Sequence, residues 1–144
     1  MEDLRDVRHY LGGAKAIGSP QTELDFVAII RKGLPASALE SLRTRTELSE
    51  ETIVNSLRIA KRTAARRKQQ GDRLKPSESE RLFRLAKTFA TATDVLGTKE
   101  NARQWLLSPN LSLGGNPPIK LLDTGIGFQQ VIDVLGRIEF GVYS

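Results

Sequence analysis

The chain has 144 residues, of which 39% are hydrophobic and 6% aromatic, so it can bury one modest aliphatic core or two small ones. It has no cysteine, which excludes disulfides and thiolate metal sites and is compatible with a reducing cytosol. Its charged N-terminus lacks a signal-peptide pattern, and its longest apolar run, at 26 to 30, is far too short for a membrane span. We therefore expect a cytoplasmic protein with no membrane partner.

Residues 1 to 21 contain three glycines and a proline and show little helical period, so we expect a flexible N-terminal arm. Helix signals then follow one another, beginning with residues that can cap a helix: Thr22, Ser49, Thr98 and Thr124. After Pro76, Ser77 and Glu80 have the spacing of a capping box. No segment alternates with the period of two typical of strands. The chain is predicted to be all-α, with a hinge near residues 71 to 76.

The net charge of +5 is concentrated in one block. Residues 61 to 75 hold seven bases and one acid, a local net charge of +6, so the remaining 129 residues sum to −1. A solvated helix surface is the ordinary explanation of such a run. One basic block in an otherwise nearly neutral chain nevertheless favours nucleic acid as a partner.

Residues 49 to 71 have the spacing of a helix-turn-helix, in which the second helix enters the major groove of DNA. On a helix starting near Lys61, positions 62, 66 and 69 share one face. The residues expected to contact DNA are Lys61, Arg62, Thr63, Arg66, Arg67 and Gln69. Arg62, Arg66 and Gln69 suit base edges, whereas Lys61 and Arg67, together with Lys68, suit phosphates. Arg58 stands where glycine would ease a left-handed turn residue, and Ala60 cannot cap the second helix. A helical bundle that does not touch DNA is the alternative.

Catalysis is not expected. Asp123, Thr124 and Gly125 spell the aspartic-protease triplet, but they join two helical segments, where Asp and Thr are ordinary capping residues. His9 is the single histidine and lies in the predicted arm. No nucleophile–base pair and no metal-ligand spacing can be assembled. We predict a binding protein that is not an enzyme and needs no cofactor or metal.

Several stretches between residue 33 and the end of the chain resemble one family. They are "GLPASALESL", "RTAARR", "SESERLFRLAKTFATATDVLG", the Trp105-Leu106 pair before "SPN", "LLDT" and "GRIEFGVYS". Together they resemble the Xre/MbcA/ParS-like antitoxins that partner RES-domain toxins. The resemblance implies an N-terminal Xre-like helix-turn-helix domain, here residues 22 to 75, followed by a small helical toxin-binding domain, here residues 76 to 144.

The resemblance also implies a function. Members of this family bind and silence a toxin that degrades NAD, and many repress their own operon by binding operator DNA. We expect a homodimer, because one recognition helix reads only a few base pairs and paired half-sites give useful affinity. The alternative is a stand-alone helix-turn-helix repressor whose C-terminal domain dimerises or senses a ligand.

The end of the chain is the expected point of contact with the toxin. A helix that stops at glycine lets the following tyrosine, a large and rigid interface anchor, and a terminal carboxylate project beyond it. We hypothesise that this tail enters the NAD cleft of the toxin and blocks it; the alternative is that the tyrosine packs on the antitoxin itself. The residues expected to bind the toxin are Arg137, Glu139, Gly141, Val142, Tyr143 and Ser144.

Overall fold

The computed structural model describes residues 4 to 141, which fold into α-helices and two short 3-10 helices, with no strand in that range. The all-α prediction is confirmed. The elements are α1 (Leu4–Tyr10), α2 (Ala14–Ile17), α3 (Glu23–Lys32), α4 (Ser37–Thr46), α5 (Glu50–Leu57), α6 (Lys61–Gln70), α7 (Pro76–Leu96), α8 (Lys99–Leu107), η1 (Leu111–Leu113), η2 (Pro118–Leu121) and α9 (Gly125–Glu139).

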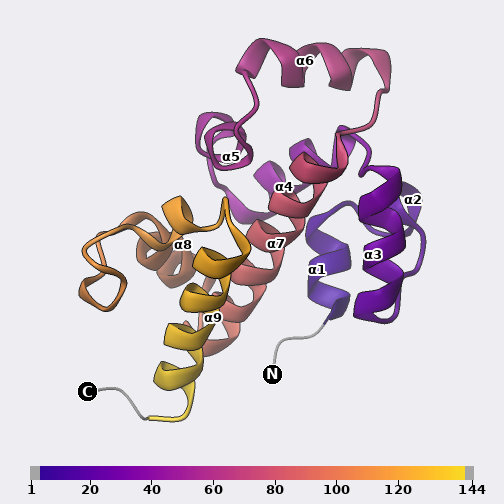
Figure 1. The fold of residues 1–144 in the computed structure, drawn as a ribbon. Helices are drawn as coiled ribbons and strands as arrows, with labels where there is room; N and C mark the ends of the chain where they lie inside the picture. The colour runs from indigo at the N-terminus through magenta and orange to yellow at the C-terminus, as the bar shows by residue number, and fades with distance from the viewer. Residues whose placement is uncertain (1–3, 142–144) are drawn as a thin grey trace.

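The 21-residue helix α7 runs through the middle of the molecule, with α1 and α3 on one side and α8 and α9 on the other (Figure 1). Its apolar residues recur three and four positions apart, so they form one buried stripe. The fully buried members of that stripe are Leu82, Leu85, Ala86, Phe89 and Ala92. Residues from both halves of the chain pack on it, and the buried side chains form one connected core.

Residues 4 to 21 are not a flexible arm, so that expectation is wrong. Val7 and Tyr10 are buried on one face of α1, and Leu11, directly after the helix, is buried as well. The Tyr10 ring lies edge-on to Phe89 of α7, with 5.4 Å between the ring centroids. Gly12, which suggested looseness, has a φ of 113° and allows the turn after α1.

Most helix starts were predicted correctly because their caps are local. The hydroxyls of Thr22, Ser49, Thr98 and Thr124 each accept a hydrogen bond from the backbone N–H three residues later. The capping box expected at Ser77 and Glu80 is wrong. Helix α7 starts at Pro76, and Glu78 accepts a 2.8 Å hydrogen bond from the N–H of Lys75.

The segment from 71 to 76 is pinned and does not have the form of a hinge. The N–H of Leu74 donates to the carbonyl of Leu34 at 2.8 Å, and the N–H of Ala36 donates to the carbonyl of Asp72 at 3.1 Å. The backbones approach so closely that a Cβ at Gly33 would lie 2.3 Å from the Leu74 carbonyl oxygen. The link between α6 and α7 is thus fixed by backbone hydrogen bonds, and only glycine fits opposite it.

Candidate functional site

The helix-turn-helix consists of α5, a short turn and α6, with the bounds that the sequence predicts. Arg58 ends α5 in the left-handed region, with a φ of 59°, and Ala60 makes no side-chain capping bond to α6. The buried side chain of Ile59 anchors the turn, and Ala64 is the buried residue of α6. Arg58 and Ala60 are therefore the unusual turn residues that the sequence indicated, and the turn forms in spite of them.

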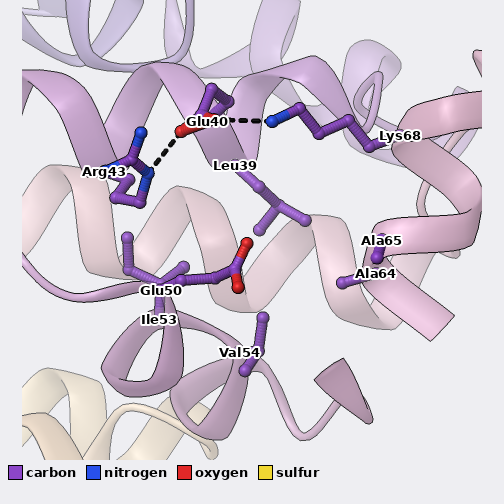
Figure 2. A pocket seen from close by; sticks show the side chains of 9 residues that line it. All are labelled: Leu39, Glu40, Arg43, Glu50, Ile53, Val54, Ala64, Ala65 and Lys68. Atoms are coloured by element: carbon purple, nitrogen blue, oxygen red, sulfur yellow. Dashed lines mark hydrogen bonds and ion pairs between the residues drawn. The ribbon is translucent and has the colours of Figure 1, made fainter. Parts of the chain in front are cut away.

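Helix α6 packs over α4 and α5 through small and branched side chains. Figure 2 shows Ala64 and Ala65 facing the seam formed by Leu39, Ile53 and Val54. The hollow left between these helices is about 20 Å³, the space of a single water. The seam is a packing contact and not a ligand pocket.

Three of the basic residues of α6 bind carboxylates of the same chain. Lys68 Nζ lies 2.5 Å from Glu40 Oε1, as Figure 2 shows, and Lys61 Nζ lies 3.7 Å from Glu50 Oε1. Arg67 pairs with Glu78 of α7. Both of these side chains are about nine-tenths buried, at 11% and 10% exposure.

Arg67 was expected to contact a DNA phosphate, and the structure places it elsewhere. Its guanidinium is enclosed against Glu78, so removing it from that site would leave a carboxylate unpaired in a poorly hydrated position. Arg67 therefore fastens α6 to α7. The sequence signal for this role was Glu78 itself, an acid placed just after the basic block.

The outward face of α6 carries three of the other expected DNA contacts. Arg62, Arg66 and Gln69 are exposed, and among the described residues neither arginine is held by an ion pair. Their spacing of four and three residues aligns them along one side of the helix. Thr63 is half-buried. Helix α6 lies at one edge of the molecule, so this face is accessible to a duplex (Figure 1).

Glu40 of α4 is the carboxylate that binds Lys68 of α6. Hydrogen bonds from Arg43 and then from Lys68 lower the pKa of its carboxyl group to about 2. The group is consequently ionised throughout the physiological range. It holds Lys68 towards α4, away from the outward face of α6.

The C-terminal half contributes α8, α9 and the irregular segment between them. Arg137 and Glu139 are exposed in the last turn of α9, and Gly141 follows the helix with a φ of 69°. Phe140, which was not predicted as a contact, is 77% exposed between them. The signal for it was its position: it follows Ile138 by two residues and so falls off the buried stripe. The predicted contacts Val142, Tyr143 and Ser144 lie outside the described residues.

The triplet from Asp123 to Gly125 joins the two halves structurally. Thr124 caps α9 by accepting a hydrogen bond from the N–H of Gly127 at 3.0 Å. Asp123 lies 3.7 Å from Arg58, so the turn of the helix-turn-helix meets the start of α9. In residues 4 to 141, no three His, Asp or Glu side chains gather as a metal site would require. The same range holds no helix with the length and hydrophobicity of a membrane span.

Comparison with known proteins decides the family. The Antitoxin Xre-like helix-turn-helix domain matches residues 25 to 87, and the Antitoxin Xre/MbcA/ParS C-terminal toxin-binding domain matches residues 91 to 141. Antitoxin Xre of Yersinia enterocolitica is 32% identical over 116 residues, which cover 80% of this chain and 78% of that protein. The chain belongs to the Xre antitoxins.

Two further relatives agree with this assignment. Antitoxin Xre of Photorhabdus laumondii is 30% identical over 118 residues, covering 81% of this chain and 80% of that protein. A Sphingobium protein named Prs ADP-ribosylating antitoxin is 28% identical over 130 residues, covering 84% and 82%. This Xre antitoxin thus joins a helix-turn-helix to a toxin-binding domain. The two matched regions meet inside α7, whereas we expected a division between residues 75 and 76.

Proposed function

We propose that this Xre antitoxin neutralises a RES-domain toxin, which degrades NAD, by occupying its active-site cleft, and that it binds its own operator as a homodimer. One observation carries the proposal: a helix-turn-helix and a toxin-binding domain occur in one chain. Helix α6 and the end of α9 lie at opposite ends of the view in Figure 1. DNA and toxin therefore have separate surfaces to bind.

The last turn of α9 and the residues that follow it form the proposed plug. Arg137 and Glu139 are exposed charges for the rim of the cleft, and Phe140 adds an exposed aromatic ring. Aromatic and arginine side chains are enriched among the residues that dominate binding energy in interfaces. Tyr143, outside the described residues, extends the plug in the hypothesis drawn from the sequence.

The proposed DNA surface is narrower than the basic block suggests. Arg62, Arg66 and Gln69 are available for base edges, while Arg67 and Lys68 are held by carboxylates. Fewer phosphate contacts mean a shallower dependence of affinity on salt. A dimer compensates by presenting two α6 helices to two half-sites.

A second kind of toxin is favoured by the name of the Sphingobium relative, which links an antitoxin of this family to ADP-ribosylation. Transfer of ADP-ribose, like degradation of NAD, consumes NAD. In this version the antitoxin blocks the same cleft but prevents modification of a target protein. The amount of cellular NAD and the presence of an ADP-ribosylated protein distinguish the two.

Co-expression with the product of the adjacent reading frame tests the proposal. We expect the toxin alone to stop growth, and the full chain to restore growth and to co-purify with it. Deletion of residues 142 to 144 should release the toxin without changing the helical circular dichroism signal. As a matched control, replacing Arg62 and Arg66 with alanine should abolish operator binding and leave growth rescue intact. A full chain that neither rescues nor co-purifies contradicts the proposal and favours the stand-alone repressor.

A further inference from the structure

The loop from Asn110 to Asn116, here called the 110–116 loop, presents one leucine to solvent. Leu111 is 96% exposed, more than any other large apolar side chain among the described residues. Two positions on, Leu113 is only 7% exposed and packs into the core. The loop therefore buries one leucine and displays the other at its surface.

Hydrogen bonds within the loop keep it in one shape. The carbonyl of Asn110 accepts from the N–H groups of Leu113 and Gly115 at 3.0 and 2.9 Å. The side-chain carbonyl of Asn110 accepts from the N–H of Ser112 at 2.9 Å, and the N–H of Asn110 donates to the carbonyl of Asn116 at 3.2 Å. A surface that is already ordered loses less conformational entropy when it binds. Leu111 is thus displayed on a preorganised support.

The stretch of chain around Leu111 carries no charge. In a chain with 27% charged residues, none occurs from Gln104 to Ile119. Beside the loop, α8 and the end of α7 border a hollow of about 410 Å³ whose lining is uncharged and includes Leu96 and the single tryptophan, Trp105. A scarcity of charged residues and the presence of a tryptophan are typical of the centre of a protein–protein interface. A nucleic-acid surface would need lysine or arginine.

We propose that the 110–116 loop and the hollow beside it form a second contact surface for the toxin, with Leu111 as the anchor that enters an apolar pocket. The inference rests on the proposed function, which requires a toxin to bind. The occupant follows from position, because the whole surface lies within residues 91 to 141, the toxin-binding domain of the family. It is separate from the plug at the end of α9, so the toxin is held at two places.

Substitution of the anchor gives the first test. Leu111→Asp places a charge on the proposed surface without touching the core, since the side chain is 96% exposed. We expect its dissociation constant for the purified toxin to rise by about tenfold to a hundredfold. The matched control is Leu24→Asp on α3, at a leucine 79% exposed and outside residues 91 to 141, with a change below about threefold.

The outcomes separate this inference from the proposed function. A wild-type chain that does not bind the toxin overturns both. If the wild type binds and Leu111→Asp binds equally well, or if Leu24→Asp loses as much affinity, the second contact surface is overturned and the plug remains.

Trp105 provides an independent readout. Because it is the single tryptophan, a chain labelled with fluorotryptophan gives one fluorine resonance from the hollow. We expect that resonance to shift when unlabelled toxin is added, because the toxin replaces water over the ring. An unchanged chemical shift in the complex overturns the inference. So does a shift that depends on the concentration of the antitoxin alone, since a second copy would then cover the surface.

Discussion

Helices α6 and α7 are neighbours in the chain, yet they are held in place by different forces. Helix α7 buries nine of its 21 residues and lies at the centre of the molecule. Helix α6 buries one residue of ten, Ala64, and is otherwise fastened by ion pairs to α4, α5 and α7. A helix that must present polar side chains to a ligand has few left for the core, so charge replaces apolar burial as its attachment.

The difference has a consequence for stability. The stabilisation from buried apolar surface changes little with pH or with moderate ionic strength near neutrality, whereas the stabilisation from an ion pair depends on both. Helix α6 is therefore expected to loosen locally under conditions that leave α7 intact. Since α6 is the proposed DNA-reading helix, those conditions should weaken operator binding before they weaken toxin binding.

The largest expected effect is the loss of the α7 core. Phe89→Ala should lower the free energy of unfolding by about 3–5 kcal/mol, because the ring is fully buried and supports Tyr10 of α1. Such a loss is a large part of the stability of a domain of this size. Urea unfolding followed by circular dichroism measures it. The exposed control Leu24→Ala should change the same quantity by less than about 0.5 kcal/mol, and a similar loss in both variants would refute the assignment.

A smaller effect is expected where α6 is fastened to α7. Arg67→Ala leaves the Glu78 carboxylate without its cation, although Glu78 still accepts from the N–H of Lys75. Because that hydrogen bond remains, we expect a loss of about 2 kcal/mol in the free energy of unfolding, less than the roughly 3–5 kcal/mol typical of breaking a buried pair. Arg66→Ala, one position along and exposed, should cost less than about 0.5 kcal/mol.

For operator binding we expect the reverse order of these two variants, with the larger loss of DNA affinity in Arg66→Ala. Electrophoretic mobility shifts should show Arg66→Ala losing affinity while its unfolding curve matches the wild type. If Arg67→Ala is as stable as the wild type and loses only DNA affinity, Arg67 is a phosphate contact after all.

The smallest effect is the pH dependence of the Glu40 site. Arg43 and Lys68 lower the pKa of Glu40 to about 2 in the folded chain, against an ordinary value of 4.5. A lowered pKa stabilises the fold above the unfolded value, and that contribution is lost as the pH falls from about 4.5 to about 2. Because a third of the side chain is exposed, we expect about 1 kcal/mol.

The matched variant for this site is Glu40→Gln. It should be less stable than the wild type by about 1 kcal/mol at neutral pH and equal to it near pH 2. Urea unfolding of both chains at several pH values measures the difference, in which the other carboxyl groups cancel. A difference that persists unchanged at pH 2 would show that packing, and not charge, accounts for the effect.

Local interactions explain what could be predicted. Thr22, Ser49, Thr98 and Thr124 cap helices through the N–H three residues later, so their effect is visible in a short stretch of sequence. The stripe of α7 and the bounds of α6 follow from periodicity and flanking residues in the same way.

Contacts between distant segments explain what could not be predicted. Gly12 suggested a loose arm. The contact that orders this segment could not be read locally, because Phe89, the partner of Tyr10, lies far along the chain. The 71–76 link suggested a hinge because its hydrogen-bond partners belong to residues 34 to 36. Leu111 is exposed and Leu113 is buried because of the way in which the loop packs on α9.

By itself, the sequence determined the helical class, most helix starts, the helix-turn-helix and the family resemblance, since all of these depend on residues a few positions apart or on matching stretches. The tertiary structure alone decided which basic residues face solvent and which, like Arg67, pair with a carboxylate inside the molecule. The physical reason is that the position of a charge along the chain does not say how much water or which opposite charge surrounds it. Burial and pairing are properties of the folded neighbourhood, and they separate a binding residue from a structural one.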